Sequence, residues 1–116
     1  MQLKAYWAYD FGCEQTLEGM RSVFNEAGPW HWELHDSAWY GDYLITYPAN
    51  GVCVRIHEYP QMGEAGEFVG LQRKGFSALL EIKDESSAAR EEVDEVFRGL
   101  LQKVNAKKTT EIEPYD

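Results

Sequence analysis

The sequence has 116 residues, 44% of them hydrophobic, which is enough for one globular domain over residues 1–116 and argues against intrinsic disorder. Twenty acidic against eleven basic residues give a net charge of −9 at pH 7, which disfavours binding to nucleic acids and to anionic membrane surfaces. The same charge attracts a basic partner, although a charge excess also serves solubility alone.

Cysteine content and hydropathy indicate the compartment. The two cysteines, Cys13 and Cys53, form neither a Cys-x-x-Cys pair nor a disulfide framework, which favours a reducing environment. The first residues lack the uninterrupted apolar run of a signal peptide. No segment approaches the roughly 18 apolar residues that span a bilayer. We therefore expect a soluble cytoplasmic protein.

The first two predicted elements are a strand and a helix. Residues 3–11 place apolar side chains at every second position, which is typical of a half-buried strand. Over residues 14–27 the apolar period changes to three and four residues, and Gly28-Pro29 supplies a stop. This change of period predicts a helix over residues 14–27.

The segment WHWELHD, residues 30–36, is predicted to be an amphipathic strand. Its apolar face consists of Trp30, Trp32 and Leu34, and its polar face consists of His31, Glu33 and His35. Because a strand rises about 3.4 Å per residue, the two histidines lie about 13–14 Å apart and cannot bind one zinc ion. A metal site here needs a third ligand from another strand, with His57 or Glu58 as candidates. We predict no metal site and a solvent-facing polar strand face.

Further strands are predicted in the middle of the chain, over residues 43–47, 52–59 and 76–83, with a shorter strand-like stretch at 67–72. Pro48-Ala49-Asn50-Gly51 is a turn between the first two, and residues 60–66 are a flexible connection. Within residues 52–59, one face carries Val52, Val54 and Ile56, and the other carries Cys53, Arg55, His57 and Tyr59. Residues 76–83 alternate in the same way, with Phe76, Ala78, Leu80 and Ile82 on one face and Ser77, Leu79, Glu81 and Lys83 on the other.

The last major element is a second amphipathic helix, for which Ser86 or Ser87 is the predicted N-cap. Its apolar stripe consists of Ala89, Val93, Val96, Phe97, Leu100 and Val104. Its first turns carry Glu91, Glu92, Asp94 and Glu95, which suit the helix dipole and a solvated face. The tail, residues 106–116, is predicted either to be flexible or to add an edge strand at residues 109–112.

Together these elements predict an α+β fold: an antiparallel sheet of about five strands with two helices on one face, in the order β-α-β-β-β-β-α. Short links between strands favour antiparallel hairpins, and both helical stripes need the same sheet face. The order of elements resembles that of TATA-binding-protein-like and ferredoxin-like two-layer sandwiches. The resemblance is one of topology and implies no activity, because such folds support many functions.

A polar set is expected on the sheet face opposite the helices, comprising His31, Glu33, His35, Arg55, His57, Tyr59, Glu81 and Lys83. The candidates for acid–base catalysis within this set are His57, His35, Glu33 and Arg55. The alternative is an ordinary water-facing side of an antiparallel sheet. The sequence contains no Gly-x-Ser-x-Gly, Walker A or Rossmann pattern. We predict no cofactor and favour a non-enzymatic protein.

Aromatic residues form a second candidate site. The segment SAWYGDY, residues 37–43, holds Trp39, Tyr40 and Tyr43, which together with Tyr59 resemble the rigid anchors of binding surfaces. The alternative is that Trp39 or Tyr40 closes one end of the core.

Three functional hypotheses follow from these features. The favoured one is a non-enzymatic interaction module, similar to an inhibitor or immunity protein, that binds a basic protein partner. The alternative is a small-molecule-binding or catalytic domain that uses the His/Arg/Glu/Tyr sheet face. A third hypothesis is that a sheet edge or the open face mediates homodimerisation.

Overall fold

The computed structural model describes residues 3–37, 41–58 and 74–112, which form a six-stranded antiparallel sheet and two helices. The strands are β1 (Leu3–Cys13), β2 (Glu33–Ser37), β3 (Gly41–Thr46), β4 (Val52–Glu58), β5 (Lys74–Lys83) and β6 (Lys107–Ile112). The helices are α1 (Leu17–Ala27) and α2 (Arg90–Lys103). The predicted α+β class is confirmed.

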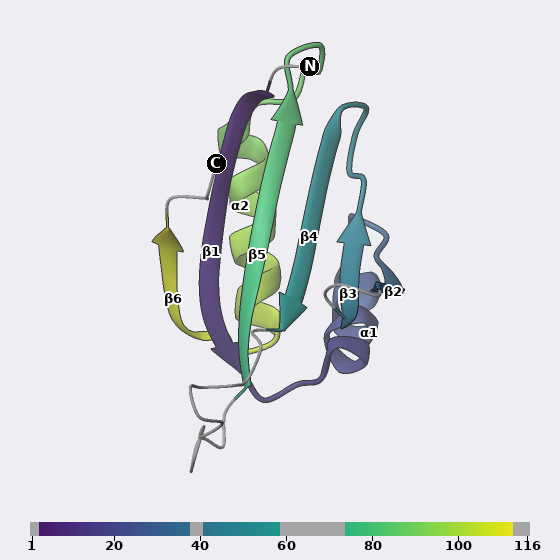
Figure 1. Ribbon diagram of the computed structural model, residues 1–116, viewed down its shortest axis with the longest axis vertical. Coiled ribbons are helices and arrows are strands. Elements are labelled where there is room, and N and C mark those ends of the chain that lie inside the picture. The colour runs from purple at the N-terminus through teal and green to yellow at the C-terminus, as the bar shows by residue number, and fades with distance from the viewer. Residues whose placement is uncertain (1–2, 38–40, 59–73, 113–116) are drawn as a thin grey trace.

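The strand order in the sheet is β2-β3-β4-β5-β1-β6, and both helices lie on the same face (Figure 1). The sheet has six strands rather than five because Lys107–Ile112 pairs with β1. The predicted edge strand at residues 109–112 is confirmed, and it begins two residues earlier, at Lys107. The strand-like stretch predicted at residues 67–72 lies outside the described residues.

The core lies between the sheet and the helices. Trp7 and Tyr9, at alternate positions of β1, face the helices and are each 2% exposed. Tyr9 packs against Phe97 of α2, with ring centroids 5.9 Å apart, and Phe24 of α1 packs on Trp32 at 5.1 Å. Full burial of each large apolar side chain contributes about 1.5–3 kcal/mol, so these aromatic contacts fix both helices on the sheet.

The predicted faces of β4 and β5 are confirmed. The residues that face the helices are all at most 1% exposed: Val52, Val54, Ile56, Phe76, Ala78, Leu80 and Ile82. The residues between them face away from the helices: Cys53, Arg55, His57, Ser77, Leu79, Glu81 and Lys83. This second face is called the open face below.

The WHWELHD segment contains a shorter strand than predicted, because β2 begins only at Glu33. Before it, both backbone groups of Trp32 bond to the side chain of Asn25 in α1, at 2.7 and 3.2 Å. The carbonyl of His31 accepts a hydrogen bond from the hydroxyl of Thr46 at 2.6 Å. Trp32 is fully buried, and Trp30 and Leu34 are half-buried against the core, which agrees with the predicted apolar face of this segment.

Both helices begin later than predicted. Helix α1 starts at Leu17 because the Thr16 side chain caps it, accepting a hydrogen bond from the Gly19 amide at 3.0 Å. The predicted serine cap of α2 is wrong: its N-cap is Ala89, without a side-chain hydrogen bond. The Ser86 hydroxyl instead accepts from the Ala88 amide at 3.1 Å, because short polar side chains also stabilise local turns.

Candidate functional site

Open-face residues form rows that cross the sheet, and the predicted polar residues His35, His57, Glu33 and Arg55 lie in two of these rows. Cross-strand neighbours in the first row are His35, Tyr43, His57, Ser77, Asp10 and Thr110. The second row contains Glu33, Ile45, Arg55, Leu79, Ala8 and Ile112. The sequence predicts that the catalytic candidates share one face of the sheet. Which residues lie beside them on adjacent strands is determined by the strand order.

Two of these side chains have altered acid–base properties. The Glu33 carboxylate lies 3.0 Å from the His35 imidazole, and this hydrogen bond lowers the pKa of Glu33. His57 is half-buried, and burial together with the nearby Arg55 guanidinium lowers its pKa. The His57 imidazole is therefore mainly neutral at pH 7.

The remaining predicted site residues do not converge with His57. His31 precedes β2, and His35 is separated from His57 by Tyr43, which puts two strand spacings of about 4.8 Å between them. Within residues 3–37, 41–58 and 74–112, no three His, Cys, Asp or Glu side chains are grouped so that they could hold a metal ion. The predicted anchors Trp39, Tyr40 and Tyr59 lie outside the described residues.

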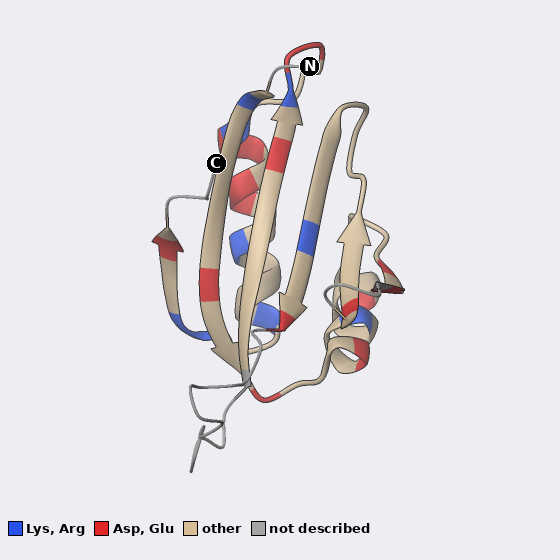
Figure 2. Ribbon diagram, viewed as in Figure 1, with Lys and Arg blue, Asp and Glu red and all other residues tan. Residues whose placement is uncertain are grey.

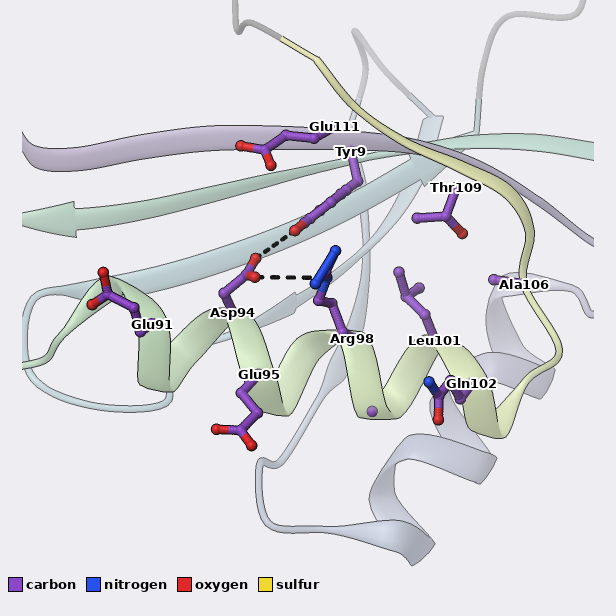
Figure 3. Close-up of a pocket in the computed structure, with 11 residues that line it drawn as sticks. Tyr9, Glu91, Asp94, Glu95, Arg98, Leu101, Gln102, Ala106, Thr109 and Glu111 are labelled. Atoms are coloured by element: carbon purple, nitrogen blue, oxygen red, sulfur yellow. Dashed lines mark hydrogen bonds and ion pairs between the residues drawn. The ribbon is translucent and has the colours of Figure 1, made fainter.

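A groove of about 850 Å³ lies on the helix side of the sheet, between α2 and β6 (Figure 3). Helix α2 contributes one flank, with Glu91, Asp94, Glu95, Arg98, Gly99, Leu101 and Gln102. The opposite side is formed by Tyr9 of β1, by Ala106, and by Thr109 and Glu111 of β6. The described lining thus carries four carboxylates and one guanidinium, and Figure 2 shows the acidic positions in the first half of α2 and at the end of β6.

Asp94 is held firmly inside this groove. Its Oδ1 accepts hydrogen bonds from the Trp7 indole N–H at 2.8 Å and from the Tyr9 hydroxyl at 2.6 Å. The Arg98 Nε lies 3.7 Å from the other carboxylate oxygen. Burial and the bond to Asp94 raise the pKa of Tyr9 to about 12, so the phenol stays protonated at neutral pH.

Arg90 joins the two sides of the groove near the start of α2. Its guanidinium lies 4.8 Å from the ring centroid of Trp7, a cation–π geometry. The same group is 2.6 Å from the Glu111 carboxylate on β6. Arg90 therefore couples the first turn of α2 to β1 and to β6.

Glu91 and Glu95 are the two acidic side chains of the groove for which the described residues supply no partner. Both are exposed, and neither side chain makes a hydrogen bond or ion pair in the part of the chain that the structure describes. They are four residues apart on one helix, where like charges repel by about 0.2–0.5 kcal/mol. In the sequence these residues indicate only a solvated helix face, because the groove exists only where β6 forms its other side.

No protein-family model matches this sequence, and no curated protein matches it. Among the described helices, none has the length and apolar content needed to cross a membrane.

Proposed function

We propose that this protein is a non-enzymatic interaction module that binds a basic segment of a partner protein in the groove between α2 and β6. The observation that carries the proposal is the acidic lining, in which Glu91 and Glu95 have no described cationic partner. A lysine or arginine side chain bound there neutralises the repulsion between the two glutamates.

The groove also has the mixed character of a binding surface. Tyr9 and Leu101 supply apolar lining, and the carboxylates surround them. The contacts of Asp94 and Arg90 hold the groove walls before any partner arrives. A preformed site loses less side-chain entropy on binding, which favours affinity.

The proposal places the protein in the cytoplasm, in a role similar to that of an inhibitor or immunity protein. The element order, like that of TATA-binding-protein-like and ferredoxin-like sandwiches, is compatible with this role and with many others. The net charge of −9 supports the assignment, since it speeds encounter with a basic protein.

The test is a calorimetric titration with a basic peptide of alternating lysine and threonine. The groove variant is Glu91→Gln with Glu95→Gln, and the matched control is Glu26→Gln with Glu85→Gln, which removes two exposed charges elsewhere. Two lost charge contacts of roughly 0.7 kcal/mol each weaken binding about tenfold in the groove variant. The control is expected to change affinity less than about twofold, because long-range attraction is screened by salt.

If the control variant loses as much affinity as the groove variant, the peptide binds through net charge and the groove assignment is wrong. The same conclusion follows if neither variant weakens binding. Repeating the titration at higher salt separates the screened, long-range part from the local contacts.

A second candidate function is a polar small-molecule site on the open face. It is favoured by the direct register of His35, Tyr43 and His57 on three adjacent strands. Its test is the response of the histidine ring signals to a panel of polar metabolites in NMR spectra. His57→Ala is expected to abolish that response while the melting temperature stays nearly constant. If the substitution mainly unfolds the protein instead, His57 has a structural role and this candidate function is wrong.

A further inference from the structure

We propose that the basic segment binds as an added β-strand along the free edge of β6, with alternate lysine or arginine side chains in the groove. This inference rests on the proposed function and names the conformation and pattern of the partner. It follows from the position of β6, the direction of its side chains and the acidic lining of the groove.

The first argument is the position of β6 at the end of the sheet. In the described part of the chain, β6 pairs with β1 and has no neighbour on its other side. In an antiparallel pair, alternate residues direct their N–H and C=O groups towards the neighbouring strand and the others point away. The outer edge of β6 therefore offers backbone donors and acceptors to an extended segment.

The second argument concerns which half of β6 is suited to pairing. Its first half carries Lys107 and Lys108, and Lys108 has a positive φ of 53°. The register with β1 also shifts there, between Asp10 and Gly12. Lysine side chains and irregular backbone geometry make an edge strand less able to pair with another strand. The second half pairs with β1 in regular register from Thr110 to Ile112, so a partner strand aligns there.

The third argument is the direction of the side chains. Thr109 and Glu111 line the groove, whereas Thr110 and Ile112 lie opposite Asp10 and Ala8, whose side chains are on the open face. A strand added beside β6 places every second side chain next to Thr109 or Glu111, with Cβ atoms about 4.5–5.5 Å apart. The other side chains of that strand point to the open-face side.

Charge selects the residues that enter the groove. In Figure 3, Glu91 and Glu111 lie towards the same end of the groove. A long cationic side chain on the added strand reaches this end beside Glu111. The favoured partner pattern is therefore basic at alternate positions, with small or neutral residues between them.

A second copy of this chain fits the edge less well. Two copies, each with a net charge of −9, repel one another. Antiparallel pairing centred on residues 109–112 of both copies places Glu111, which already pairs with Arg90, opposite Thr110 rather than opposite a lysine. The edge therefore favours a basic partner.

The experiment compares peptides of equal composition and charge by calorimetry with the full chain. The first alternates four lysines with four threonines, and the second has them in two blocks. Two further versions of the alternating peptide are N-methylated, either at every lysine nitrogen or at every threonine nitrogen. Because these nitrogens point to opposite edges of a strand, one methylated set is expected to weaken binding about tenfold and the other to be tolerated. The block peptide is expected to bind more weakly than the alternating one.

Equal effects of the two methylated sets, or equal binding of the block peptide, would overturn strand addition. The proposed function survives that result if the Glu91→Gln, Glu95→Gln variant still loses affinity relative to its control. A groove variant that binds every peptide like its control contradicts both proposals. A protein that sediments as a dimer and binds none of the peptides assigns the edge to a second copy and overturns the inference.

Discussion

Tyr9 and Asp10 are neighbours on β1, yet their side chains point to opposite faces of the sheet and meet contrasting surroundings. On the helix face, the Tyr9 hydroxyl donates to Asp94, which also accepts from Trp7. On the open face, Oδ1 of Asp10 is buried and has no hydrogen-bond partner among the described residues. The polar groups of the groove thus connect α2 to the sheet through hydrogen bonds. Polar residues occur on the open face because alternate side chains of a strand point away from the core.

This contrast favours the groove over the open face as a binding surface. In the groove, hydrogen bonds and the Arg90 contacts orient the walls, and Glu91 and Glu95 remain available to a cation. On the open face, the histidines are spread along a row. A preoriented surface with available charge is the better candidate for binding. Four substitutions test the contrast.

The largest effect is expected for Asp94→Ala. The Trp7 indole and the Tyr9 hydroxyl both lose their acceptor inside the protein, at a cost of about 2–4 kcal/mol in the free energy of unfolding. Urea denaturation measures the loss. Glu95→Ala, at the next and exposed position, is the control and is expected to change stability by less than about 0.5 kcal/mol. A loss below about 1 kcal/mol for Asp94→Ala means that the two donors find other partners.

Tyr9→Phe removes one hydrogen bond to a carboxylate and is expected to cost about 1.5–2 kcal/mol near neutral pH. The pKa of Tyr9 in the folded protein is about 12, above its ordinary value of 10. Its contribution is therefore complete below pH 10 and is lost as the pH rises through 12. The stability difference between wild type and variant, followed by denaturation across this range, is expected to shrink; a constant difference contradicts the assigned bond.

Arg90→Gln is expected to have a smaller effect, about 0.5–1.5 kcal/mol, because the cation–π contact with Trp7 and the ion pair with Glu111 are partly exposed. The comparison is Arg98→Gln, whose guanidinium lies 3.7 Å from Asp94 on the helix surface. We expect the Arg98 variant to lose about 0.3–0.5 kcal/mol. Equal losses in thermal denaturation indicate that Arg90 does not join α2 to β6.

The smallest effect on stability is expected for Asp10→Asn, within about 0.5 kcal/mol, because its buried Oδ1 makes no hydrogen bond to any described residue. The Asp10 carboxylate raises the pKa of His57, against the effects of burial and Arg55. Its neutralisation therefore lowers the pKa of His57 further, which an NMR titration of the imidazole measures. Asp84→Asn, in the exposed turn after β5, is the control. An upward shift of the His57 midpoint rules out this electrostatic link.

The sequence by itself determined the faces of the strands and the class of the fold. Side chains alternate along any extended strand, so the period of two in residues 52–58 and 76–82 identified the core face without knowledge of the neighbouring strands. Short links likewise required antiparallel pairing. The exact helix starts were less accessible, because Ser86 stabilises a local turn as readily as it caps a helix.

Only the tertiary structure decided which residues meet. The groove forms only when β6 pairs with β1 and α2 packs on the same face of the sheet. The hydrogen bond between Tyr9 and Asp94 joins positions 85 residues apart. No local period reports such a contact, since strand order depends on the packing of the whole chain. The acidic turns of α2 were visible in the sequence as a charged helix face. These turns form one wall of a groove only because β6 pairs at the edge of the sheet and forms the opposite wall.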